Sequence, residues 1–180
     1  MIFCSLGTMD MPFERMAYAI DMFAATTDEE VIVQTGWTNY PYKHISKSFK
    51  MCTKEEMEHY QEEASLLIMQ GGWGSICESM EKGKRMVIIP RYDGTEHIHD
   101  QFQLIRKLDE IGTVVGVFPS EFNPKMYKEQ YDETAKLLKS AVDKAQSFDF
   151  KTIKKGNAEP LLRQKIEELG CGKRICLASS

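Results

Sequence analysis

The sequence predicts an α/β domain in which helices cover both faces of a parallel sheet, a doubly wound fold. Short apolar runs of strand length alternate with segments whose apolar residues recur at helical spacing. The run at residues 86–89 is almost entirely apolar, which is typical of a strand buried on both faces. Strands that alternate with helices need right-handed crossovers, so the sheet should be parallel.

The first part of the chain contains two predicted helices. Pro12 suits the first position of one helix, and apolar residues follow it at helical spacing. Thr53 and Glu56 form a capping box, so the next helix should begin there. The strand-like runs in this part are residues 2–6, 31–34, 48–52 and 66–69.

The rest of the chain predicts two further strands, at 86–89 and 114–118. Helices are expected at 75–82 and 100–111, ended by Gly83 and Gly112, and a long helix should follow Asn123 and Pro124. The sequence becomes polar beyond Ala145. We therefore expect an α/β domain over 1–145, then a polar linker and a C-terminal helix at 161–169 over 146–180.

Composition narrows the class of protein. The 180 residues are 42% hydrophobic and 28% charged, which is ordinary for a globular domain, and five scattered cysteines fit a reducing compartment. A net charge of −4 disfavours a general nucleic-acid binder, which needs a basic face. We find no membrane-spanning run and no basic signal-peptide region, so we expect a cytoplasmic protein.

Four loops follow predicted strands and should open onto one edge of the sheet, where such folds bind ligands. They are Gly7-Thr8, Thr35-Gly36, Gly71 to Ser75 and Pro90 to His97. The third is rich in glycine and leads into a helix, so unpaired N–H groups there could bind a diphosphate. The alternative is a tight turn that needs glycine only for packing. It is neither a dinucleotide fingerprint nor a nucleoside-triphosphate loop, because Cys77 replaces the third glycine and no Gly-Lys-Ser/Thr follows.

Polar residues after this loop suggest further contacts. Glu78 could accept hydrogen bonds from ribose hydroxyls, although a solvated surface glutamate is the simpler alternative. Arg91 or His97 could neutralise phosphate, and Asp100 with a glutamine could bind a sugar. The competing interpretation is a polar loop that caps the next helix. We expect no metal site, because a pair of alternate histidines rarely chelates without a third ligand.

Together these segments resemble the C-terminal, donor-binding half of glycosyltransferase family 28. The likeness covers about residues 1–118, through "IFCSLGTMDMPFERM", "EEVIVQTGWTNY", "GGWGSICESMEKGKRMVIIPR" and "EHIHDQ". It looks closest to the split bacterial exopolysaccharide and capsule proteins and to the soluble subunit of the eukaryotic two-subunit UDP-N-acetylglucosamine transferase. Each motif is weak by itself, but their order and spacing are specific.

The resemblance implies the Rossmann-like C-terminal half of a GT-B glycosyltransferase. Residues 7–8 would border the phosphates, and residues 34–36 would line the nucleotide cleft. Residues 71–75 would bind the diphosphate, Glu78 the ribose, and residues 90–91 would flank the base. Glu96, His97, Asp100 and Gln101 would face the donor sugar. The implied nucleotide- and donor-binding set is Gly7, Thr8, Gln34, Thr35, Gly36, Gly71, Gly72, Trp73, Gly74, Ser75, Glu78, Pro90, Arg91, Glu96, His97, Asp100 and Gln101.

Two departures from the family pattern concern donor selectivity. Gln70 stands where relatives often have histidine, and the sugar-binding glutamine could be Gln101 or Gln103. The resemblance further implies an inverting reaction without a bound metal, in which a helix dipole does the work of a cation. No catalytic residue can be assigned, so we expect the general base on a partner.

The leading hypothesis is the donor-binding subunit of a split hexosyltransferase that uses a UDP-sugar. A membrane-anchored partner subunit would bind a lipid-linked acceptor in polysaccharide or glycolipid synthesis and would recruit this chain to the cytoplasmic face of the membrane. The second hypothesis is a non-catalytic partner that stabilises or activates a complete transferase. A third is a free-standing nucleotide-binding enzyme of the same fold, because fold alone does not decide function.

Overall fold

In the part of the chain that the structure describes, six parallel strands form a sheet in the order β3-β2-β1-β4-β5-β6. The computed structural model describes residues 1–92, 94–120, 123, 126–151 and 160. The strands are β1 (Ile2–Ser5), β2 (Val31–Gln34), β3 (Lys47–Phe49), β4 (Leu66–Gln70), β5 (Met86–Ile89) and β6 (Val115–Gly116). The helices are α1 (Glu14–Ala24), α2 (Lys54–Glu63), α3 (Trp73–Glu81), α4 (Phe102–Ile111) and α5 (Tyr127–Ser147). The predicted doubly wound parallel sheet is confirmed.

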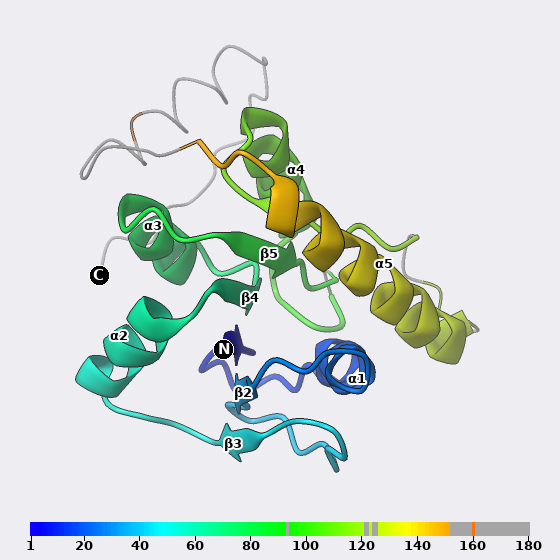
Figure 1. The fold of residues 1–180 in the computed structure, drawn as a ribbon. Helices are drawn as coiled ribbons and strands as arrows, with labels where there is room; N and C mark the ends of the chain where they lie inside the picture. The colour runs from blue at the N-terminus through cyan, green and yellow to red at the C-terminus, as the bar shows by residue number, and fades with distance from the viewer. Residues whose placement is uncertain (93, 121–122, 124–125, 152–159, 161–180) are drawn as a thin grey trace.

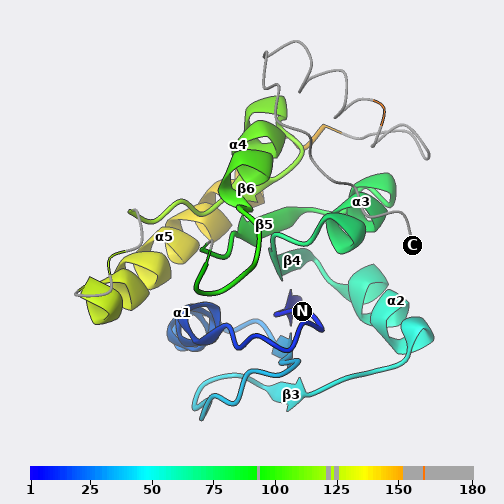
Figure 2. The same cartoon turned by 180° about the vertical axis from the view of Figure 1, so that it is seen from behind.

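Helices cover the two faces of the sheet unequally. Helices α1 and α5 pack side by side on one face, and α2, α3 and α4 lie on the other (Figures 1 and 2). Successive strand residues point to opposite faces. Cys4 therefore packs in the core beneath α1 and α5, whereas Phe3 packs in the core beneath the other three helices. Every residue of β1, β2 and β5 is buried, as the apolar sequence of 86–89 predicted.

Several boundaries differ from the prediction by a few residues. Helix α1 begins at Glu14, so Pro12 precedes the helix, and α3 begins at Trp73 rather than at residue 75. Strand β6 has two residues instead of the expected five, and the N–H of Gly116 donates to Oδ1 of Asp109 at 3.0 Å. The capping box of α2 and the left-handed Gly112 after α4 are confirmed.

The packed unit continues past the expected boundary at residue 145. Helix α5 runs to Ser147, and Phe148 and Phe150 pack against the core beneath α1 and α5. The N–H of Lys151 donates to the carbonyl of Gly112 at 2.9 Å, which ties this segment to the end of α4. The helix expected at 161–169 lies outside the described residues. Within the described residues, no helix is both long and apolar enough to cross a membrane.

Candidate functional site

The loops after β1 and β2 pack directly against each other at the carboxyl edge of the sheet. Gly36 has a φ of +57°, and a Cβ atom there would overlap the carbonyl oxygen of Gly7. The buried side chain of Gln34, at the end of β2, links the loop after β1 to the residue that follows β3, because its Nε2 donates to Gly7 O and Lys50 O, each at 3.3 Å. Gly36 and Gln34 thus fix the positions of the backbone segments at this edge of the sheet.

A bridge of two glutamines joins the glycine loop to the loop after β5. Oε1 of Gln101 accepts from the N–H groups of Gly71 at 3.2 Å and Arg91 at 3.0 Å, and its Nε2 donates to Oε1 of Gln70 at 3.1 Å. A Cβ atom on Gly71 would lie 2.5 Å from Oε1 of Gln101, and one on Gly72 would overlap Nε2 of Gln70. A side chain at either glycine would therefore displace a glutamine of this bridge, which fits the tight-turn alternative at these two positions.

Gly74 differs from these glycines, because nothing lies within 4 Å of a Cβ atom built on it. It is the second residue of α3, whose first three N–H groups, at residues 73–75, bind no backbone carbonyl in the described part of the chain. Gly72 precedes the helix and supplies no side-chain cap, and the first turn has no acidic residue. Unpaired N–H groups, a positive dipole end and open space are the features that suit a helix terminus to binding an anion.

Glu78 lies on the same face of α3 as Gly74 and Ser75. It follows Gly74 by four residues and Ser75 by three, spacings that place side chains side by side on a helix. All three residues are exposed, whereas Ile76 and Ser79 are buried. Within the described residues the Glu78 carboxylate forms no hydrogen bond or ion pair, so both its oxygens are available for ligand hydroxyls. Thr8, in the loop after β1, is also exposed.

The loop after β5 is anchored by a buried ion pair. Nε and Nη2 of Arg15 donate to the two carboxylate oxygens of Glu96 at 3.0 and 2.7 Å, and Nη2 also donates to Pro90 O at 2.8 Å. The Glu96 carboxylate also accepts the N–H of Tyr92 at 2.9 Å. The Arg15 and Glu96 side chains are only 1% and 7% exposed. The pair thus joins α1 to a loop 81 residues away in sequence.

Arg91 reinforces this anchor from inside the protein. Its Nη1 donates to Met11 O and Glu96 O at 2.8 and 2.9 Å, and its Nη2 donates to Leu6 O at 2.9 Å. Burial lowers the pKa of the Arg91 guanidinium to about 10; the Glu96 carboxylate raises that pKa and Arg15 lowers it. Arg91 remains charged at neutral pH, and its side chain stacks at 4.4 Å over the ring of Phe13.

The structure therefore places part of the expected sugar-binding set inside the protein. Glu96 and Gln101 were expected to face the donor sugar, but they are 6% and 5% exposed and their polar atoms bind the chain itself. Asp100 is exposed, and its Oδ1 accepts the N–H of Phe102, the first residue of α4, at 2.8 Å. His97 is partly exposed. Direct contacts of these four residues with a sugar stay predictions. The hydrogen bonds of Glu96 and Gln101 show instead that these two residues hold the loop after β5 in place.

Sequence reasoning missed two further features at this edge of the sheet. Trp37, in the turn after β2, is 51% exposed, and the ammonium of Lys50 lies 3.8 Å from its ring centroid. Gln70, identified only as a departure from the family pattern, is a structural link between two loops. An aromatic residue directly after a Thr-Gly turn at a strand end was the available signal for Trp37.

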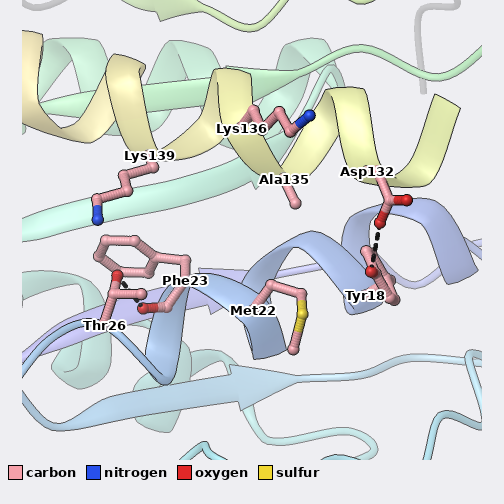
Figure 3. Close-up of a pocket in the computed structure, with 8 residues that line it drawn as sticks. All are labelled: Tyr18, Met22, Phe23, Thr26, Asp132, Ala135, Lys136 and Lys139. Atoms are coloured by element: carbon pink, nitrogen blue, oxygen red, sulfur yellow. Dashed lines mark hydrogen bonds between the residues drawn. The ribbon is translucent and has the colours of Figure 1, made fainter. Parts of the chain in front are cut away.

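A separate groove of about 290 Å³ lies between α1 and α5, on the face of the sheet opposite α3 (Figure 3). Tyr18 donates to Oδ1 of Asp132 at 2.5 Å across it. The residues that line it are Tyr18, Met22, Phe23, Thr26, Asp132, Ala135, Lys136 and Lys139. None of them belongs to the expected set. No three His, Cys, Asp or Glu side chains gather as a metal site within the described residues, and metal independence stays a prediction.

Comparisons with known proteins identify the family. The glycosyltransferase family 28 C-terminal domain matches residues 11–158. The fold is similar to the crystal structure of the glycotransferase of kitacinnamycin, with a TM-score of 0.54 and 17% identity, over 93% of this chain but only 37% of that chain. The flavodoxin-like domain of a Synechococcus protein matches at a TM-score of 0.46 and 9% identity, over 80% of this chain and 99% of that domain. No curated protein matches. The chain therefore belongs to the glycosyltransferase family 28 C-terminal domains, the Rossmann-like, donor-binding halves of GT-B glycosyltransferases.

Proposed function

We propose that the chain is the donor-binding subunit of a split, inverting glycosyltransferase that moves a hexosyl group from a UDP-sugar to a lipid-linked acceptor in polysaccharide or glycolipid synthesis. The observation that carries this proposal is the exposed start of α3. Three unpaired N–H groups, at residues 73–75, face open space at Gly74. This arrangement suits the diphosphate of a nucleotide-sugar.

The neighbouring groups fit the rest of a nucleotide. Glu78 lies one turn farther along the same helix face and can accept hydrogen bonds from both ribose hydroxyls. The loop after β5, held by Arg15 and Glu96, would border the base and the sugar. Because the anion-binding groups are backbone N–H groups aided by a helix dipole, we expect diphosphate binding without a metal ion.

The transfer reaction requires an acceptor site and a general base in addition to the donor site. An acceptor hydroxyl oxygen would attack the anomeric carbon as the bond from that carbon to UDP breaks, and a base would take the hydroxyl proton. We assign that base and the acceptor site to a membrane-anchored partner subunit on the cytoplasmic side. This chain covers 37% of the length of the transferase with a similar fold. The α3 terminus would stabilise the charge that develops on the departing diphosphate.

Thermal unfolding of the purified chain with UDP, ADP or buffer tests the donor site. A ligand at a hundred times its dissociation constant adds about 2.7 kcal/mol to the free energy of unfolding. We expect UDP to raise the unfolding midpoint, ADP to have a smaller effect and a chelator to change neither result. A midpoint that UDP leaves unchanged would favour the alternative of a non-catalytic activator.

Calorimetric titration of variants tests the role of Glu78. We expect Glu78→Ala to weaken UDP binding about tenfold or more, because two hydrogen bonds to a carboxylate are lost. Glu63→Ala is the matched control, since Glu63 is also an exposed helical glutamate but lies on α2. With a partner subunit present, transfer by Glu78→Ala at unchanged donor affinity would contradict the proposal.

A further inference from the structure

Two glutamine side chains form a directed chain of hydrogen bonds beside the glycine loop. The N–H groups of Gly71 and Arg91 both donate to one atom of the Gln101 amide, at 3.2 and 3.0 Å, so this atom is the carbonyl oxygen Oε1. The other end of that amide is therefore the donor Nε2, which contacts Oε1 of Gln70 at 3.1 Å. Because Gln101 offers only N–H at this contact, Gln70 must accept with its oxygen. Two backbone N–H groups thus fix the orientation of both amides.

This orientation leaves Nε2 of Gln70 at the outer end of the chain of hydrogen bonds. Within the described residues this Nε2 has no acceptor, and the Gln70 side chain is only partly buried. A Cβ atom on Gly7 would lie 3.1 Å from Nε2, and one on Gly72 would overlap it. Gly72 directly precedes α3 and its unpaired N–H groups at residues 73–75. The chain therefore ends beside the start of α3 in a donor that a ligand oxygen or water must satisfy.

We propose that Gln101 is a positioning residue, which orients the Gln70 amide so that Nε2 donates to the diphosphate of the nucleotide-sugar. The inference rests on the proposed function, in which the start of α3 binds that diphosphate. Gln101 is only 5% exposed and its amide is bound within the chain, so it acts on the ligand through Gln70. An N–H donor beside a positive helix end selects an anionic oxygen. With the amide reversed, Gln70 would present its own oxygen and repel the phosphate.

Side-chain amide signals test the contact directly. A ¹⁵N–¹H spectrum of the full chain contains an NH₂ pair of signals for each glutamine, and Gln70→Met removes the pair that belongs to Gln70. We expect UDP to move this pair and uridine, which has no phosphate, to leave it unchanged. The inference is overturned if the backbone N–H signals of residues 73–75 move with UDP while the Gln70 pair does not. If neither set moves, the proposed function itself has failed, so the two failures are distinguishable.

Gln101→Glu tests the positioning role. The new carboxylate still accepts the N–H groups of Gly71 and Arg91, but it offers Gln70 an acceptor instead of a donor. The Gln70 amide should then turn, so that its Nε2 donates to this carboxylate and its oxygen faces the diphosphate. We expect UDP binding in calorimetry to weaken about tenfold or more. Gln146→Glu is the matched control and should keep full affinity, because Gln146 is an exposed glutamine on α5.

A double-mutant cycle separates positioning from a merely structural role. In the Gln70→Met background there is no amide to orient, so adding Gln101→Glu should weaken UDP binding by no more than about twofold. An equal loss in both backgrounds would mean that Gln101 acts without Gln70, which overturns the inference. Full UDP affinity of the Gln101→Glu single variant overturns it too. If Gln101→Glu does not fold, the Gln70 signals of the unaltered chain decide the question alone.

Discussion

Removing the charge of Glu96 should destabilise the fold strongly, because it leaves two buried guanidinium groups without their carboxylate. The closest Arg15–Glu96 contact is 2.7 Å. At an effective dielectric constant of about 20, the attraction at this distance is about 6 kcal/mol before desolvation is subtracted. Breaking a buried pair by removing one partner costs about 3–5 kcal/mol. Arg91, which the Glu96 carboxylate also stabilises, adds to the cost.

Urea unfolding of Glu96→Gln measures this cost. We expect a loss of about 3–5 kcal/mol in the free energy of unfolding, a large share of the roughly 5–15 kcal/mol of a typical domain. Glu110→Gln is the matched control, because Glu110 pairs with Lys107 at 2.9 Å but is 58% exposed. Exposed pairs contribute about 0–1 kcal/mol. A loss below about 1 kcal/mol for Glu96→Gln would refute the claim that this pair anchors the loop.

Three other predictions concern the glycines and a tyrosine. Gly36→Ala should destabilise the fold by at least about 1 kcal/mol in urea unfolding, since the new Cβ would overlap Gly7 O at positive φ; an unchanged midpoint would contradict this contact. Gly74→Ala has open space and should keep or raise the unfolding midpoint, yet weaken UDP binding in calorimetry; full affinity would argue against binding at this helix end. The hydrogen bond to Asp132 raises the pKa of Tyr18 to about 12. This bond should stabilise the fold fully below pH 10 and less as pH rises toward 12. In an ultraviolet titration, the variant Tyr18→Phe identifies the pKa that belongs to Tyr18, and Asp132→Asn should lower that pKa.

The fold was predictable because its signals are local. The apolar run of β5, the capping box at Thr53 and the glycine after α4 each depend on residues close in sequence. The glycine loop was recognisable for the same reason. Sequence alone did not separate Gly74, which opens onto space, from Gly71, which Gln101 contacts, because that difference depends on a side chain 30 residues away.

The interior of the site was not predictable for a physical reason. Arg15 is a charged residue in a helix, and such residues are almost never fully buried unless they are paired. Its partner, Glu96, is 81 residues away, so only the folded chain shows that the carboxylate neutralises a buried guanidinium instead of facing a ligand. Trp37 presents the converse problem. A tryptophan is expected to be largely buried, and its exposure becomes visible only when the turn after β2 is placed.

The central claim is that backbone N–H groups at the start of α3 bind a nucleotide diphosphate, and the amide signals of those residues test it most directly. In a ¹⁵N–¹H titration of the full chain with UDP and chelator, we expect the signals of Trp73, Gly74 and Ser75 to move together with one dissociation constant. UMP should move them less, because it lacks the second phosphate. If UDP binds while the signals of these three amides do not move, the helix terminus is not the phosphate site and the account is wrong.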